Sequence, residues 1–217
     1  MPKKMLVISY ALAVLMLAAP ALAGPPFLCH QFEIGSAKSL PWIGGDWLGA
    51  RSDYDITHVV ADTQALLTTD VPTLVRMETL RRAVLYASRD RALAERFVAA
   101  LAARVDATDK AGHAHALALF DLGYTLEAMS EVEMLGHFMG SDLAARGRAL
   151  AGMTRPDEGR ALILKSAALR TDDAGIAFAL ALIERTADRE PHLLKARAGA
   201  TQDRVLAANM ARLQMLQ

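Results

Sequence analysis

Apolar residues recur at helical spacing between residues 71 and 105, which read VPTLVRMETLRRAVLYASRDRALAERFVAALAARV. Positions three and four residues apart share one face of an α-helix. Two such stripes flank a short turn at residues 88–90, and they contain Leu74, Met77, Leu80, Val84, Ala87, Leu93, Phe97, Leu101 and Val105. Either stripe alone would leave large side chains in water, so we expect the two helices to fold back on each other as a hairpin.

Charged residues occupy the other faces of this hairpin, namely Arg76, Glu78, Arg81, Arg82, Arg91, Glu95, Arg96 and Arg104. Glu78 reaches Arg81 and Arg82 three and four residues later, a spacing that favours ion pairs on a helix. We interpret these faces as solvated. The alternative is that Arg76, Arg81 and Arg82 bind an anion or a partner, because guanidinium groups recognise carboxylates and phosphates. Asp70 and Asp90 are expected to cap the two helices.

The same periodicity predicts helices over residues 56–67, 112–129, 142–150, 157–169, 172–183 and 191–198, and a last helix capped by Thr201. Apolar residues on two faces of the 112–129 segment indicate a central, buried helix. Aromatic residues make up only 6% of the chain and alanine and leucine are abundant, which favours helix over sheet. We therefore expect residues 52–217 to be an all-α domain of antiparallel helical hairpins, arranged as an irregular α-solenoid or an orthogonal bundle.

The first 23 residues have the pattern of a secretory signal peptide. Lys3 and Lys4 precede an apolar run over residues 5–19, and Pro20 and the tripeptide at residues 21–23, Ala-Leu-Ala, follow it. We expect cleavage after Ala23 and a periplasmic or secreted location. The alternative is an uncleaved anchor, because residues 5–23 could just span a bilayer.

Residues 24–51 are rich in proline, glycine and aromatic side chains, which predicts irregular structure with one helical turn near residues 36–40. Phe27, Phe32, Trp42 and Trp47 are too apolar for a free tail, so we interpret the segment as an arm held against the helical domain. The alternative is that Trp42 and Trp47 line a groove for a ligand or partner.

Four short stretches of the chain read PPFLCH at residues 25–30, SLPW at 39–42, RMETLRRA at 76–83 and FDLGY at 120–124. In these stretches the chain resembles a family of uncharacterised exported bacterial helical proteins. That resemblance implies export and a helical fold, and it implies no activity. Leu119, Leu122, Gly123 and Leu126 are similar to the opening of a tetratricopeptide unit. The similarity covers half of one unit.

The charge balance argues against a nucleic-acid partner. Loss of Lys3 and Lys4 with the leader would leave 22 basic and 24 acidic residues, spread along the chain. Nucleic-acid binding needs a basic patch, and electrostatic docking on a membrane needs one too. We therefore expect neither nucleic acid nor, after cleavage of the leader, a membrane as partner.

Cys29 and His30 are the most specific candidates for metal chemistry. A thiolate beside an imidazole could bind a transition metal. They could also form half of a covalent haem site, with Pro26 where the first cysteine of C-x-x-C-H would stand. The alternative is that Cys29 is a small apolar residue in the arm.

Three other clusters carry a weaker signal. Met129, Met134, His137 and Met139 contain the soft ligands that copper(I) prefers, although methionines more often fill gaps in a core. His113 and His115 diverge on a helix, which disfavours a shared metal. Asp121, Tyr124 and Glu127 lie on an apolar helix, where Asp121 is expected to pair with an arginine of the hairpin or to act as an acid in a pocket.

The sequence contains none of the G-x-S-x-G, H-E-x-x-H, P-loop and C-x-x-C motifs. The favoured function is an exported, non-enzymatic helical scaffold for a protein or peptide, since stacked hairpins offer extended surfaces. A metal or haem protein that uses Cys29 and His30 is the alternative. An enzyme with acids at Asp121 and Glu127 is the least favoured reading.

Overall fold

The computed structural model describes residues 27–110, 112–184 and 188–215, and over these residues the chain is all-α, as predicted. There is no strand in these ranges, apart from one isolated bridge between Trp42 and Ala50. The α-helices are α2 Val59–Leu66, α3 Thr73–Ala87, α4 Arg91–Ala107, α5 His113–Gly136, α6 Ser141–Leu150, α7 Glu158–Leu169, α8 Ala174–Ile183, α9 Arg189–Ala200 and α10 Arg204–Met215. Two 3₁₀ turns, η1 Phe27–Cys29 and η2 Ile56–His58, precede them. The expected signal peptide at residues 1–23 lies outside the described residues.

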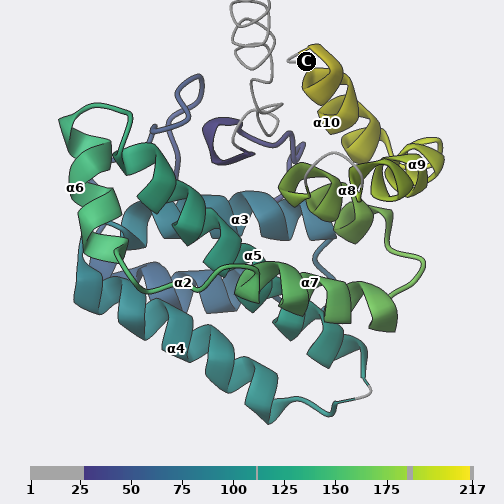
Figure 1. Ribbon diagram of the computed structural model, residues 1–217, viewed down its shortest axis with the longest axis horizontal. Coiled ribbons are helices and arrows are strands. Elements are labelled where there is room, and N and C mark those ends of the chain that lie inside the picture. The colour runs from purple at the N-terminus through teal and green to yellow at the C-terminus, as the bar shows by residue number, and fades with distance from the viewer. Residues whose placement is uncertain (1–26, 111, 185–187, 216–217) are drawn as a thin grey trace, which may run out of the picture.

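Helix α5 is the centre of the structure. It packs against α3, α4, α6, α7, α8 and η1, and Figure 1 shows α3, α4, α6, α7 and α8 around it. The prediction of a central helix at residues 112–129 is confirmed, but α5 continues to Gly136. A solenoid arrangement is not confirmed, because in a solenoid each hairpin contacts only its neighbours. Here α5 contacts helices from both halves of the chain.

The hairpin at residues 71–105 has the expected helices and turn, with a different packing. Helices α3 and α4 each pack mainly on α5 and only slightly on each other. As a result, every residue of α3 except Arg82 is buried. The prediction of a solvated charged face is therefore wrong for α3. It holds on α4, where Arg91, Glu95 and Arg96 are exposed.

Two glycines allow α5 and α7 to cross in close contact. A Cβ atom on Gly123 would stand 2.6 Å from the carbonyl oxygen of Gly159, and one on Gly159 would stand 2.5 Å from the carbonyl oxygen of Gly123. Only glycine permits this approach of the two backbones. The close approach of the two helices therefore explains why a glycine follows Leu122, without any tetratricopeptide unit.

The helix caps follow the sequence only in part. Asp90 caps α4 as expected, since its carboxylate accepts from the Leu93 amide at 2.7 Å. Asp70 does not cap α3, because Pro72 holds the cap position without a side-chain bond. At α10 the cap is Asp203, which accepts from the Leu206 amide at 3.0 Å. Thr201 instead donates to the Ala198 carbonyl at the end of α9.

The arm, residues 27–51, packs against α3 and against α5 around Tyr124 and Glu131. Phe27, Leu28, Phe32 and Leu40 are buried in the core, whereas both tryptophans are half-buried. The expected helical turn at residues 36–40 is wrong; the only helical turn of the arm in the described residues is η1. None of the described helices combines the length and the apolar character needed to cross a membrane.

Candidate functional site

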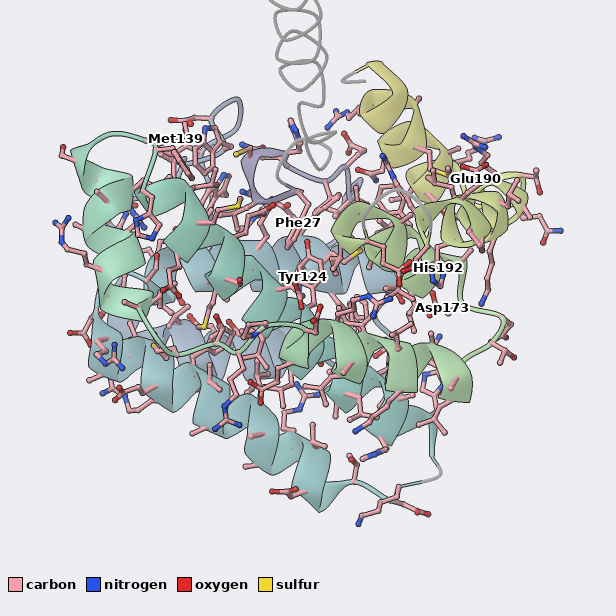
Figure 2. All side chains as sticks on the ribbon, viewed as in Figure 1. Phe27, Tyr124, Met139, Asp173, Glu190 and His192 are labelled. Carbon is pink, nitrogen blue, oxygen red and sulfur yellow. The ribbon has the colours of Figure 1, made fainter. Side chains whose placement is uncertain are left out.

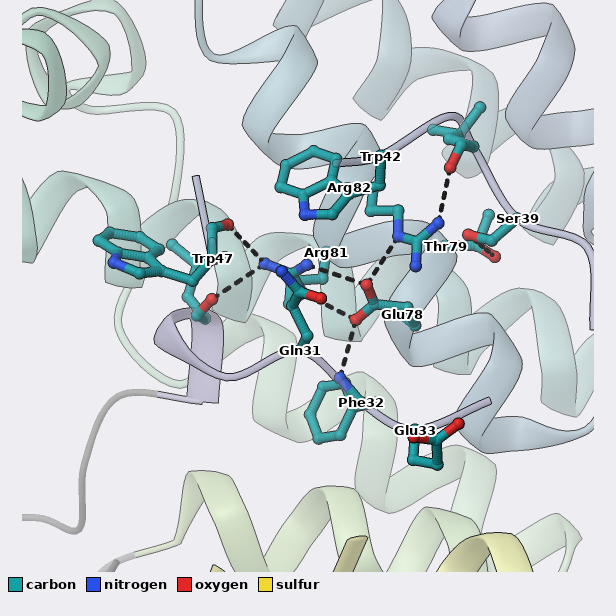
Figure 3. A network of polar contacts seen from close by, with 12 residues as sticks. Gln31, Phe32, Glu33, Ser39, Trp42, Trp47, Glu78, Thr79, Arg81 and Arg82 are labelled. Atoms are coloured by element: carbon teal, nitrogen blue, oxygen red, sulfur yellow. Dashed lines mark hydrogen bonds and ion pairs between the residues drawn. The ribbon is translucent and has the colours of Figure 1, made fainter. Parts of the chain in front are cut away.

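Glu78 of α3 is the central residue of a buried polar network that holds the arm (Figure 3). Its carboxylate receives the Arg81 guanidinium at 2.8 and 2.9 Å and the Arg82 guanidinium at 2.7 Å. It also accepts from the backbone amide of Phe32 in the arm at 3.0 Å. Both Glu78 and Arg81 have side chains with no exposed area. A desolvated carboxylate of this kind is stable only when its oxygens are paired, which is what the network provides.

The two arginines extend the network to arm carbonyl groups. Arg81 donates to the carbonyls of Leu28 and Trp47 at 3.2 and 3.0 Å, and Arg82 donates to that of Leu40 at 2.7 Å. Trp42 covers them, with the Arg81 guanidinium 5.0 Å from its ring centre, a cation–π distance. The arm is thus held through its backbone by charged side chains from α3.

Arg76 forms a second buried ion pair, with Asp121 of α5. Its Nε and Nη2 atoms each lie 2.9 Å from a carboxylate oxygen, and both side chains are at most 1% exposed. The predicted pairing of Asp121 with a hairpin arginine is confirmed. Arg76 and Arg81 are therefore interior side chains with their partners in the same chain, and Arg82 is 16% exposed. They do not form the accessible arginine cluster that an external anion or partner would need.

Glu131 of α5 holds the beginning of the arm, a role the sequence did not indicate. Its two carboxylate oxygens accept from the Phe27 and Leu28 amides at 3.0 and 2.7 Å. Phe27 then packs against Tyr124, with ring centres 5.1 Å apart and the ring planes tilted by 45°; both residues are labelled in Figure 2. Burial raises the pKa of Glu131 to about 8, although both amide hydrogen bonds oppose the shift.

This carboxyl group makes stability depend on pH. Its folded-state pKa of about 8 exceeds the ordinary value of 4.5, so the native state binds the proton more tightly than the unfolded chain does. The stability that it contributes is complete below about pH 4.5 and is lost as the pH rises through 8. We expect the free energy of unfolding, measured by urea titration, to fall across that window by at most about 5 kcal/mol.

The variant Glu131→Gln tests this effect through the slope of stability against pH, since its NH₂ group would face the Phe27 or the Leu28 amide and lower stability at every pH. It should remove most of the pH dependence, whereas Glu95→Gln, which changes an exposed carboxylate on α4, should retain it. Equal slopes of stability against pH in Glu131→Gln and the unchanged protein would show that another group is responsible.

A groove of about 500 Å³, here called the arm groove, opens between the arm and the C-terminal helices. Its apolar walls are Phe27, Phe32, Trp47, Phe178 and Leu182. Cys29 and His30 also line it, together with Gln31, Gly45, Asn209 and Arg212. Of the two tryptophans proposed for a groove, Trp47 lines this one. Trp42 lies over the arginines instead.

The environment of Cys29 and His30 favours their neutral forms. Burial, with a smaller contribution from the nearby Glu131 carboxylate, raises the pKa of the Cys29 thiol to about 11. Burial and the Arg81 charge lower the pKa of His30. The His30 Nε2 atom is buried without a hydrogen-bond partner. Among the described residues no cluster of three or more His, Cys, Asp or Glu side chains could hold a metal ion.

The other suggested ligand clusters are not assembled. Met129 is fully buried, whereas Met134 and Met139 are 46% and 44% exposed. His115 pairs with Thr108 at 2.9 Å, while His113 lies 2.7 Å from a nitrogen of Arg170. Glu127 accepts from the Arg160 amide at 2.6 Å and does not touch Asp121, whose partners are Arg76 and Arg104.

A second groove, here called the acidic groove, lies beside the C-terminal end of α5 and has a volume of about 940 Å³. Its described carboxylates are Glu127, Glu133, Asp157, Glu184 and Asp188. Arg160 is the one described basic side chain with a fixed charge that lines it, and it pairs with Glu184 at 2.8 Å. Apolar side chains border the carboxylates: Met134, Phe138, Pro156 and Ile183. Burial, followed by the Asp157 charge, raises the pKa of Glu127 even though the Arg160 amide donates to it.

Comparisons of this chain with protein-family models, with curated proteins and with solved structures found no match.

Proposed function

We propose that the chain is an exported, non-enzymatic helical scaffold, periplasmic or secreted, that binds a segment of another protein at the acidic groove. The observation that carries the proposal is Phe138, which is 82% exposed. Met134 also lines the groove, and Met139, which is labelled in Figure 2, follows Phe138 along the chain. A large aromatic side chain kept in water next to two methionines is typical of a surface that a partner covers.

The charges of the groove indicate the kind of partner. Five described carboxylates face one guanidinium that is already paired. The groove also receives the negative end of the α5 dipole, since α5 ends at Gly136. A segment with alternating apolar and basic side chains would meet both features, and flexible methionines adapt to such segments.

Fluorescence anisotropy with a labelled helical peptide of leucine and lysine tests the proposal. We expect binding that weakens with added salt and is absent for the same peptide with glutamate in place of lysine. Phe138→Ser should weaken binding by about tenfold or more, as loss of an aromatic hot spot does. The matched control is Leu194→Ser on α9, which removes another exposed apolar side chain. Equal binding by both variants would exclude this surface.

Haem or metal binding through Cys29 and His30 remains the second candidate, because the arm groove brings the two side chains to one apolar, aromatic site. The chemistry would be axial ligation by the His30 imidazole and attachment at the Cys29 sulfur. The test is the visible absorption spectrum of the exported protein, before and after haem is added, compared with Cys29→Ala and His30→Ala. An unchanged spectrum in all samples would end this candidate.

A further inference from the structure

The arm groove differs from the acidic groove in what its walls can offer. Its walls are aromatic and aliphatic, and the polar groups around them are largely engaged within the chain. The Gln31 amide donates to the Asp46 carbonyl. The Asn209 side chain bonds to both backbone groups of Glu33 and to the Val205 carbonyl.

Backbone donors along the arm are engaged as well. The amides of Phe27, His30 and Phe32 donate to Glu131, to the Phe27 carbonyl and to Glu78. A peptide in this groove would lose hydrogen bonds to water and find few replacements, which is unfavourable. A hydrocarbon chain has no such groups to satisfy and gains from contact with apolar walls. A volume of about 500 Å³ suits a ligand of small-molecule size.

The charge on the groove has one sign. Among the residues that the structure describes, no carboxylate lines the groove, and the only lining side chain with a fixed charge is Arg212 of α10. Arg212 bonds to the Gln31 carbonyl at 3.4 Å and to Glu33 at 3.1 Å, and both side chains of that ion pair are more than 40% exposed. An ion pair this exposed is weak, so the guanidinium can also receive the anionic group of a ligand.

We propose that the arm groove binds a free fatty acid, with the hydrocarbon chain between Phe27, Trp47, Phe178 and Leu182 and the carboxylate at Arg212. This site is separate from the acidic groove, so it can fail or succeed independently of the proposed protein partner.

Trp47 lines the groove and reports on its contents. In a Trp42→Phe background, its fluorescence is titrated with octanoate, decanoate and dodecanoate below their micelle concentrations. We expect saturable changes, with the affinity rising about fourfold for each added methylene group. No response, or an affinity independent of chain length, would overturn the proposal.

Two pairs of variants test where the hydrocarbon chain and the carboxylate of the fatty acid bind. Leu182→Glu should abolish dodecanoate binding, whereas Leu194→Glu outside the groove should leave it unchanged. Arg212→Gln should lower the dodecanoate affinity about threefold to tenfold without changing that of dodecanol. Its control is Arg197→Gln, which changes an arginine with a similar exposed partner, Glu190. Equal loss in both arginine variants would overturn the placement of the carboxylate.

Competing ligands distinguish a free fatty acid from a peptide or a lipid surface as the occupant of the arm groove. An acetylated leucine-phenylalanine peptide amide that binds more tightly than dodecanoate would show a peptide site instead. A Trp47 response to phosphatidylglycerol vesicles without any response to dodecanoate would show contact with a lipid surface. Either result overturns the assignment to a free fatty acid.

Discussion

Replacing Asp121 with alanine is expected to destabilise the protein by about 3–5 kcal/mol, the usual effect of removing one partner of a buried ion pair. Arg76 would keep its charge in a position with no exposed side-chain area and lose two hydrogen bonds of 2.9 Å. The carbonyls of Leu67 and Thr68, which also accept from Arg76, cannot neutralise the guanidinium. Guanidinium chloride unfolding followed by circular dichroism at helical wavelengths measures the change.

Asp53→Ala is the matched control, since Asp53 pairs with Arg51 where the two side chains are 64% and 49% exposed. Loss of that exposed pair should change stability by less than about 1 kcal/mol. The double variant Arg76→Met/Asp121→Leu should recover most of the stability, because apolar side chains of similar size can replace a buried pair. Similar losses in Asp121→Ala and Asp53→Ala would contradict the account given for this pair.

Most helices could be predicted from the sequence, because their signal is local. The stripes that define α3, α4 and α5 repeat within one or two turns, and a cap such as Asp90 acts three residues away. The burial of α3 could not be predicted in this way. Arg81 stands four residues after Met77 and shares the face of the apolar stripe. Its partners and that of Arg76, the arm carbonyls and Asp121, are distant in sequence. A reading of the sequence assigns a charged residue to the surface, because the distant partner that would allow its burial cannot be identified from the local pattern.

The grooves depend on long-range contacts to an even greater degree. Phe27, Trp47, Phe178 and Arg212 come together from the two ends of the described chain. The aromatic content of the arm did point to anchors, and the structure places Cys29 and His30 in the lining of the arm groove with Phe27, Phe32 and Trp47. Glu131 gave no signal, because a glutamate on a long helix is ordinary until the amides that it binds are located. Phe138 was missed because it directly follows an apolar helix and was not distinguished from core residues.

Replacing Glu78 with glutamine is expected to release the arm and to destabilise the fold by about 3–5 kcal/mol. The neutral amide would leave Arg81 buried without a counter-charge, and its NH₂ group would face either the Phe32 amide or a guanidinium, both of which are donors. Hydrogen–deuterium exchange should accelerate over residues 27–51 far more than over α5, whose contacts with α6 and α7 do not involve Glu78. Tryptophan emission should shift to longer wavelengths, because Trp42 and Trp47 both lie on the released segment.

Glu95→Gln provides the control for Glu78→Gln, because Glu95 pairs with Arg91 on α4 with more than half of each side chain exposed. That variant should leave both arm exchange and tryptophan emission unchanged. If α5 and the arm of Glu78→Gln exchange at the same increased rate, the arm is an integral part of the cooperative core. Local release, with α5 protected, would mean that the charged residues of α3 hold a separable segment. In that case the arm groove opens and closes with the arm, and fatty-acid binding should slow arm exchange in the unchanged protein.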